Sequence, residues 1–286
     1  MPASLATMNG KICLVTGATS GVGLHTALGL ARRGADVILV ARRRDRAEAA
    51  ARWMQSTAGR DPLHILLADL SRPDEVRRLA QDVKARVSRL DVLVNDAAGI
   101  FLRRRETADG LESTFALNHL SYFLLSNLLL DLLAESAPSR VVNVASNSHW
   151  SARIEFGDLQ LRRGYSPLRA YANSKLGNVW FTYELARRIA GRGVTANTLT
   201  PGFVATNLGK QNRWIRPFLS VAYCAWGKPP AAGAETPVYL AASPEVEGVS
   251  GKFFIDKRAV PSSPRSYDET DAARMWQASS ELVGLG

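Results

Sequence analysis

Cysteine and histidine are scarce in this sequence. Two cysteines, Cys13 and Cys224, lie far apart in a chain of 286 residues, and the chain contains four histidines. Two cysteines cannot form the dense disulfide framework that stabilises many secreted domains, so we expect a reducing, cytoplasmic compartment. The histidines and cysteines also lack the close spacing of metal ligands, and we therefore expect no metal site.

Long hydrophobic runs are absent as well. No apolar stretch reaches the roughly 20 residues that a membrane-spanning helix needs. Residues 1–9 contain no basic segment followed by an apolar one, so no signal peptide is expected. Peripheral membrane contact stays open, because the segment Trp214–Trp226 begins with basic residues and continues with apolar ones.

Acidic residues are outnumbered by basic ones. The 36 lysines and arginines exceed the 26 aspartates and glutamates, which gives a formal charge of +10. Such an excess suits a nucleic acid, an anionic membrane or a phosphorylated ligand. Arginine runs at 42–44 and 103–105 contribute to it, and charge runs are usually solvated surfaces. We expect no nucleic-acid partner, because only the net charge favours one.

Short apolar runs alternate with longer amphipathic segments along the chain, and several of the short runs are apolar on both faces. This order predicts an α/β fold with a doubly wound parallel sheet of about seven strands and helices on both faces. The expected strands are Lys11–Thr16, Asp36–Ala41, Leu63–Ala68, Asp91–Asn95, Arg140–Ala145, Val194–Thr200 and Lys252–Ile255. The expected helices are Gly21–Arg33, Asp45–Thr57, Pro73–Ser88, Thr107–Glu135 with a break near Asn118, Leu168–Ala190 and Ala231–Ala242.

No linker or internal repeat divides the chain, so we expect a single domain over residues 1–286. Residues 10–206 would form the ligand-binding and catalytic core. Residues 207–230 carry several aromatic side chains broken by prolines, and they are interpreted as an insertion that covers a substrate. Residues 231–286 would add a helix, the last strand and a tail.

A glycine-rich turn joins the first expected strand to the first expected helix. Glycine permits positive φ and a close backbone approach, and a helix start offers free N–H groups to a phosphate. We expect a dinucleotide pyrophosphate here, although an ordinary glycine-rich turn would look similar. The candidate contacts are Gly17, Thr19, Ser20, Gly21, Val22 and Gly23.

The second expected strand ends in arginines where many dinucleotide folds place an acid. Arg42 follows this strand directly, Arg43 is next, and the first acid is Asp45. An arginine binds a 2′-phosphate that a carboxylate would repel, so the sequence favours NADP(H) over NAD(H). A solvated helix entrance is the alternative. Asp69 would face the adenine or cap the following helix.

Tyr171 and Lys175 lie four residues apart, on one face of an expected helix. A free phenol has a pKa near 10, and a nearby ammonium lowers it toward the range of a useful acid or base. This spacing is common on helix surfaces. Its position after five strand–helix units makes the pair a candidate for proton transfer to a carbonyl or from an alcohol.

Two further polar residues join this candidate site. Ser146 follows the fifth expected strand, where open α/β sheets bind ligands, and its hydroxyl could bond a substrate carbonyl. Asn118 interrupts a leucine-rich helix and could hold a water that relays protons to Lys175, or could kink the helix.

Together these features resemble the short-chain dehydrogenase/reductase family. The resemblance rests on Thr16–Gly23, the segment 95–98, Asn118, Ser146, Tyr171, Lys175 and Pro201–Gly202. It implies a Rossmann-type sheet, a catalytic tetrad of Asn118, Ser146, Tyr171 and Lys175, and hydride transfer to the B face of the nicotinamide. It also places the cofactor near Leu70, Asn95, Ala97, Pro201, Gly202, Val204 and Thr206.

Within the family, the sequence resembles the retinol-dehydrogenase-like branch through Thr107–Glu112, Asn118–Leu120, Phe156–Leu159 and Ser250–Phe254. One segment departs from the family pattern: Asn95-Asp96-Ala97-Ala98 replaces the usual Asn-Asn-Ala-Gly. Ala98 narrows the backbone's conformational range, and Asp96 adds a charge near the core of the fold.

The resemblance implies an NADP(H)-dependent oxidoreductase that acts on the carbonyl or alcohol of an apolar substrate, retinoid-, steroid- or polyketide-like. Ser146, His149, Trp150 and Tyr171 would line the substrate site. A reductase of a C=C bond or a pigment, and a catalytically silent NADPH-binding protein, are the alternatives. A homodimer through Thr107–Glu135 and Leu168–Ala190 is open, as in many relatives.

Overall fold

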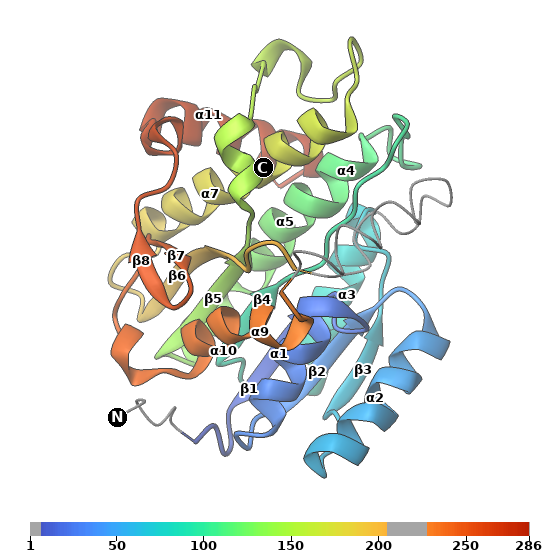
Figure 1. The fold of residues 1–286 in the computed structure, drawn as a ribbon, viewed down its shortest axis with the longest axis vertical. Coiled ribbons are helices and arrows are strands. Elements are labelled where there is room, and N and C mark those ends of the chain that lie inside the picture. Colours follow the sequence, from blue (N-terminus) through green and yellow to red (C-terminus); the bar gives the residue numbers. More distant parts are fainter. Residues whose placement is uncertain (1–6, 205–227, 286) are drawn as a thin grey trace.

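The computed structural model describes residues 7–204 and 228–285, and within them eight strands form one sheet. The spatial order is β3-β2-β1-β4-β5-β6-β7-β8 (Figure 1). The seven strands from β3 to β7 pair in parallel, which confirms the predicted doubly wound sheet. The bounds are β1 (Ile12–Thr16), β2 (Asp36–Ala41), β3 (His64–Leu67), β4 (Val92–Asn95), β5 (Ser139–Val144), β6 (Val194–Thr200), β7 (Phe253–Ile255) and β8 (Arg258–Val260).

The edge strand β8 is antiparallel to β7 and was not predicted. Asp256 and Lys257 connect the two strands with φ values of 46° and 66°. Two consecutive residues at positive φ match the twist of a tight hairpin, a role that Asn-Gly or Asp-Gly usually fills. Asp-Lys is an uncommon pair for this turn, so the sequence gives little indication of the hairpin.

Helices cover both faces of the sheet (Figure 1). One face carries α1 (Gly21–Ala31), α2 (Arg44–Ala58) and α10 (Glu235–Ala242), and the other carries α3 (Pro73–Arg86), α5 (Ser121–Leu128) and α7 (Pro167–Arg188). The shorter helices are α4 (Ser113–Phe115), α6 (Leu130–Glu135) and α9 (Pro230–Gly233). The 3-10 and π turns are η1 (Ala116–Leu120), η2 (Asn147–Ser151), η3 (Phe156–Asp158), η4 (Pro244–Val246) and η5 (Pro264–Tyr267).

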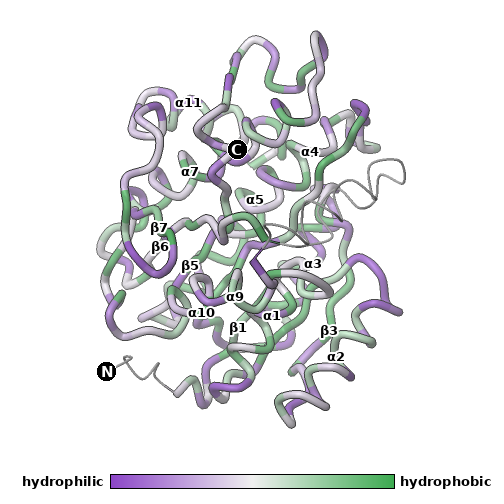
Figure 2. Tube along the Cα trace, in the orientation of Figure 1, coloured by the Kyte–Doolittle hydropathy of each residue, from purple (hydrophilic) through white to green (hydrophobic). Residues whose placement is uncertain are grey.

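Strand β1 shows how the sequence produces two cores. Leu14 joins the cluster under α3, α5 and α7, whereas Cys13 and Val15 join the cluster under α1, α2 and α10. Successive strand residues point to opposite faces, so a strand covered on both sides must be apolar throughout. Burying each such side chain contributes roughly 1.5–3 kcal/mol. In Figure 2 apolar residues recur along the strands and on the helices beside them.

The predicted helix from Thr107 begins too early. The helix starts at Ser113, where the Glu112 carboxylate caps it by accepting hydrogen bonds from the N–H groups of Thr114 and Phe115 at 2.8 and 2.7 Å. The preceding residues form a turn in which Gly110 has a φ of 73°. The break expected near Asn118 is present as the π turn η1, and such turns are frequent at functional sites.

A last helix, α11 (Glu269–Val283), lies where the sequence analysis expected a tail. Asp268 caps its start by accepting from the N–H of Asp271, and Gly284 ends it in the left-handed conformation. Its apolar side packs against α7 and α5, with the Trp276 ring 4.9 Å from that of Phe123. None of the described helices is long and apolar enough to cross a bilayer.

Candidate active site

The carboxyl ends of the parallel strands meet at one edge of the sheet, and Thr16 joins two of them. Its hydroxyl oxygen accepts hydrogen bonds from the N–H groups of Asp96 and Ala97 at 2.9 and 3.2 Å. The hydroxyl itself lies 3.4 Å from the carbonyl of Val94. This contact fixes the glycine-rich turn after β1 against the segment after β4, at the edge where open α/β sheets bind ligands.

The glycine-rich turn has no room for a side chain at Gly17 or at Gly23. Gly17 has a φ of 67°, and a Cβ added there would lie 2.9 Å from the Cα of Ala97. A Cβ on Gly23 would lie 2.7 Å from the carbonyl oxygen of Gly17. The first turn of α1 contains no acidic residue, and the side chain of its N-cap residue, Ser20, makes no capping hydrogen bond to the helix. Such a backbone cradle at a helix start fits a pyrophosphate.

The turn after β6 approaches this cradle through α9. A Cβ on Gly233 would lie 2.7 Å from a methyl group of Val204 and 3.2 Å from one of Val22, so Gly233 lets these two predicted cofactor contacts meet. Pro201 and Gly202 precede this contact, and Gly202 has a φ of 79°. Thr206 and the predicted insertion up to residue 227 lie outside the described residues.

The two arginines after β2 differ in their surroundings. Arg43 is paired with Asp45 through two hydrogen bonds of 2.6 and 3.0 Å. Arg42 is exposed and makes no ion pair within the described ranges 7–204 and 228–285. The Arg42 guanidinium is therefore the one of the two that is available for a phosphate.

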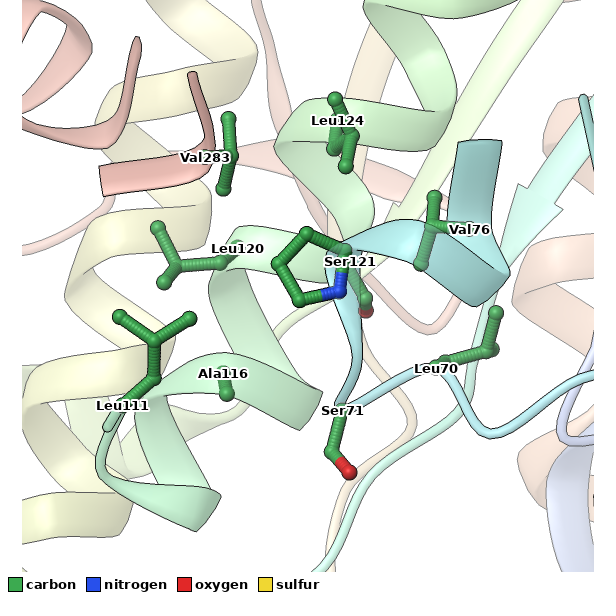
Figure 3. Close-up of a pocket in the computed structure, with 10 residues that line it drawn as sticks. Leu70, Ser71, Val76, Leu111, Ala116, Leu120, Ser121, Leu124 and Val283 are labelled. Carbon is green, nitrogen blue, oxygen red and sulfur yellow. The ribbon is translucent and has the colours of Figure 1, made fainter. Parts of the chain in front are cut away.

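Asp69 and Leu70 follow β3. The Asp69 carboxylate accepts from both the N–H and the hydroxyl of Ser71, at 3.1 and 2.7 Å, which shapes the turn before α3. Leu70 is buried and lines a small apolar pocket between α3, α5 and the end of α11 (Figure 3). The lining contains no titratable side chain, so this pocket offers no acid or base.

Asn95 lies at the end of β4 and is fully buried. Its amide nitrogen donates to Ser126 on α5 and to Asn143 on β5, at 3.0 and 2.8 Å. Asn143 in turn donates to Thr182 on α7. This chain of amides holds the helices and the central strands in register beneath the site. The side chain of Asn95 is thus used in the fold, and its predicted contact with the cofactor stays a prediction.

Helix α7 brings Tyr171 and Lys175 together as the sequence predicted. The Lys175 Nζ lies 5.6 Å from the centre of the Tyr171 ring and donates to the carbonyl of Val144 over 2.8 Å. Lys175 is buried, whereas Tyr171 is half-buried. Burial lowers the pKa of Lys175 to about 8, against an opposing attraction from Asp96. A cation held this close to a phenol favours the phenolate.

Ser146 and Trp150 lie on the segment after β5, and its turn η2 packs against α7. Ser146 is half-buried, and its hydroxyl oxygen accepts from the N–H of Ser148 at 3.2 Å. The Trp150 side chain is 57% exposed and lines a cleft of about 780 Å3. Residues of the β7–β8 hairpin form its other wall, among them Ile255, Val260 and Pro261.

His149 is oriented into the protein. The ring is 1% exposed, its Nδ1 lies 2.7 Å from the carbonyl oxygen of Ser146, and its Nε2 accepts from the N–H of Ser263 at 3.0 Å. Burial lowers the pKa of this imidazole. Both ring nitrogens are thus occupied by the protein, and the predicted role of His149 in lining the substrate site is untested.

Asn118 sits on the π turn and is completely buried. Its side-chain amide exchanges two hydrogen bonds with the backbone of Gly99, at 2.8 and 3.0 Å, and lies 3.1 Å from the hydroxyl of Ser174. The backbone carbonyl of Asn118 accepts a hydrogen bond from the side-chain amide of Asn178 at 2.8 Å. Asn118 therefore connects the loop after β4 to α7, and the predicted water relay stays a prediction.

Three residues near the pair escaped the sequence analysis. Tyr122 of α5 is buried with its ring centre 5.5 Å from the Lys175 Nζ, and its hydroxyl finds no partner in the described part of the chain. Ser174 and Asn178 continue the polar face of α7 that carries Tyr171 and Lys175. Their spacing of three and seven residues from Tyr171 was a visible indication, because a polar stripe on a buried helix needs partners.

Comparison with known proteins agrees with this geometry. The family model described as short chain dehydrogenase matches residues 11–215. Human retinol dehydrogenase 14 is 42% identical over 97% of this chain and 88% of its own length. Human retinol dehydrogenase 13 is 39% identical over 99% of this chain and 87% of its own length.

Solved structures give the same result. An uncharacterised protein from Mycobacterium paratuberculosis superposes with a TM-score of 0.80 at 35% identity, covering 98% of this chain and 96% of its own. Pseudomonas aeruginosa RhlG in complex with NADP superposes with a TM-score of 0.70 at 29% identity, covering 87% of this chain and 95% of its own.

The chain belongs to the short-chain dehydrogenase family. It is therefore an oxidoreductase of alcohols or carbonyls that uses a nicotinamide cofactor. Within this family it is retinol-dehydrogenase-like, as the sequence resemblance indicated.

Proposed function

We propose that the chain transfers a hydride between NADP(H) and the carbonyl or alcohol of an apolar substrate. The proposal rests mainly on the contact of Tyr171 with Lys175 beside the carboxyl ends of β4 and β5. A phenol and a buried ammonium at this edge form an acid–base pair next to the expected nucleotide site.

The cofactor, when bound, donates or accepts the hydride. Gly17, Gly21 and the first turn of α1 would hold its pyrophosphate, since Gly17 and Gly23 leave no room for a side chain and Gly21 has a positive φ. In reduction Tyr171 gives its phenolic proton to the substrate oxygen, and in oxidation it removes the alcohol proton. Lys175 keeps positive charge beside that phenol, and the Ser146 hydroxyl orients the substrate oxygen.

The direct test is the substitution Tyr171→Phe, which removes one hydroxyl. We expect substrate-dependent NADPH oxidation to fall at least about 100-fold, because a positioned general acid contributes roughly 100- to 10,000-fold. NADPH binding, measured by fluorescence titration, should change less than about twofold. Normal turnover by the variant would refute this mechanism.

The preference for NADP(H) is supported by Arg42, which is exposed at the end of β2 without a carboxylate partner in the described residues. We expect Arg42→Ala to raise the KM for NADPH about 10- to 100-fold and to leave the KM for NADH nearly unchanged, because a charge-assisted hydrogen bond contributes roughly 1.5–3 kcal/mol. Arg43→Ala is the matched control, since Arg43 already pairs with Asp45. Equal effects of Arg42→Ala on both cofactors would contradict the preference.

An apolar, ring-bearing or long-chain substrate is supported by the exposed Trp150 ring in the cleft with the β7–β8 hairpin. Retinol dehydrogenases as relatives favour the same class. A panel of retinoid, steroid and polyketide-like ketones and alcohols, assayed with NADPH and NADP+, tests it. Activity only on a C=C bond, or tight NADPH binding without any turnover, would favour the two alternative functions.

Attachment to a membrane surface and formation of a homodimer are further parts of the proposal. For the dimer, the structure adds one constraint: α11 packs over α7 and α5, so a partner approaching these helices would meet α11 as well. Flotation with anionic vesicles and analytical ultracentrifugation test the two properties separately.

A further inference from the structure

Asp96 occupies the position after β4 where the family pattern has an asparagine. Its N–H donates to the Thr16 hydroxyl, which fixes the residue directly behind the glycine-rich turn. Its carboxylate lies against Gly23, where an added Cβ would be 2.6 Å from Oδ2, and accepts a hydrogen bond from the Gly23 N–H. A negative group therefore sits at the first turn of the helix whose N–H groups form the cradle.

Asparagine and aspartate have nearly the same shape, and the side-chain oxygen of either residue can accept from Gly23. The difference between them at this position is charge. An ionised Asp96 uses part of the positive potential at the start of α1 and adds a negative charge close to the cradle. The two phosphates of a dinucleotide need the same potential.

We propose that Asp96 couples cofactor binding to proton uptake, so that the dinucleotide binds the protonated form of Asp96 more tightly than the ionised form. The inference rests on the cofactor site of the proposed function, and it concerns binding rather than the chemical step. A neutral carboxyl would still accept from Gly23 while no longer repelling the pyrophosphate.

Two titratable groups act on Asp96 from the helices packed around it. The Lys175 ammonium of α7 attracts the carboxylate, and the Tyr122 phenol of α5 interacts with it electrostatically. Tyr171 of α7 is the next titratable group, and it interacts with Tyr122 and Lys175. Burial outweighs the attraction of Lys175 and raises the pKa of Asp96 to about 7. The carboxyl therefore titrates in the range in which a cofactor affinity can be measured.

The direction of the effect follows from linkage. A ligand that prefers the protonated form raises the pKa of Asp96 in the complex, so binding takes up a proton between the two pKa values. The Kd for the cofactor should therefore rise as pH increases above about 7. It should level off once Asp96 is ionised in both the free and the bound protein.

The experiment measures the Kd for NADPH from pH 5.5 to 9 in the wild type and in Asp96→Asn. We expect Asp96→Asn to bind at least about fivefold more tightly at pH 8.5, and equally within twofold at pH 5.5. Asp61→Asn is the matched control, because Asp61 is an exposed carboxylate that precedes the amino end of β3, whereas the proposed cofactor site lies at the carboxyl ends of the strands. It should follow the wild type at every pH.

Calorimetry of the wild type alone gives a second readout. NADPH binding at pH 7.5, measured in buffers of different ionisation enthalpy, should show uptake of a fraction of a proton, and Asp96→Asn should show less. Parallel pH profiles for the wild type and Asp96→Asn, or equal proton uptake, would overturn the inference while leaving the cofactor assignment intact. Failure of the wild type to bind NADPH at any pH would instead overturn the proposed function.

Discussion

The Nζ of Lys175 donates to the carbonyl oxygen of Val144 over 2.8 Å, which joins the middle of α7 to the end of β5. Ser146 follows Val144 by two residues. The hydrogen bond between α7 and β5 therefore helps to fix the position of the Lys175 ammonium relative to the Ser146 hydroxyl. The bond also compensates part of the cost of burying the ammonium. The position of the Lys175 ammonium therefore depends on the register of α7 against the sheet.

Replacement of this ammonium tests its role. Lys175→Met keeps the length and the apolar stem of the side chain but removes the charge and the donor to Val144. We expect kcat/KM to fall roughly 100- to 10,000-fold, because Tyr171 loses the cation beside its phenol. Steady-state assays with NADPH measure the change. Lys84→Met, on the exposed side of α3, is the control, and comparable losses in both variants would contradict the assignment.

Asp96 should also make the stability of the apo protein depend on pH. Its pKa rises from 3.8 to about 7 on folding, so the folded protein binds more protons than the unfolded chain in this window. The contribution of Asp96 to the free energy of unfolding should then fall as pH increases from about 4 to 7.

The variant Asp96→Asn removes this titration. It should be more stable than the wild type at pH 8, by on the order of 3 kcal/mol, with the difference shrinking toward pH 4. Guanidinium unfolding of both proteins at pH 5 and pH 8 measures this. If the two proteins differ by the same free energy at pH 5 and at pH 8, Asp96 is already ionised in the folded wild type at both pH values, which would contradict this prediction.

The sheet and the proximity of Tyr171 to Lys175 could be predicted because they depend on local patterns. Strands buried on both faces are apolar throughout, and Tyr171 and Lys175 share a helix face through their spacing alone. Helix α11 is not evident in the sequence because short polar and small residues interrupt its apolar face. Its caps, Asp268 and Gly284, were nevertheless visible as a start and a stop.

Other features could not be predicted because they depend on contacts between distant segments. The aromatic neighbour Tyr122 reaches Lys175 only when α5 and α7 pack together. The side chain of His149 turns inward because its Nε2 meets the N–H of Ser263, 114 residues further along the chain. No spacing rule within one segment relates such pairs, so only the packed structure shows them.

His119 connects the π turn to two helices and should limit stability in acid. Its Nδ1 lies 3.2 Å from Asn178 of α7, and its Nε2 lies 2.9 Å from Ser279 of α11. Burial lowers the pKa of this ring to about 4, below the ordinary value of 6.5. The unfolded chain therefore binds more protons at His119 between these values, and the contribution of His119 to stability should be lost as pH falls from about 6.5 to 4.

This loss should reach about 3 kcal/mol, as expected for a shift of this size. His119→Gln keeps hydrogen-bonding capacity but cannot take up a proton, so its unfolding free energy should gain about 3 kcal/mol relative to that of the wild type as pH falls across this window. Denaturant unfolding followed by far-ultraviolet circular dichroism measures both proteins. His64→Gln, at a partly buried position in β3, is the control and should show the same pH dependence as the wild type.

At Gly177 we expect a substitution by alanine to lower stability, which is opposite to its usual effect in a helix. In an ordinary helix interior, replacing glycine by alanine stabilises by about 1 kcal/mol. A Cβ on Gly177, however, would lie 2.9 Å from the Nδ1 of His119, on a ring that Asn178 and Ser279 hold in place. The ring cannot move away without breaking these contacts.

We therefore expect Gly177→Ala to destabilise the protein by roughly 1–3 kcal/mol, as overpacking of a core usually does. The substitution should also lower activity, because Asn178 bonds the carbonyl of Asn118 and Gly177 lies two residues after Lys175. Gly157→Ala is the control, since its added Cβ would meet no atom within 4 Å. Thermal unfolding and kcat/KM of both variants decide the matter, and a Gly177→Ala variant as stable as the wild type would show that His119 can yield.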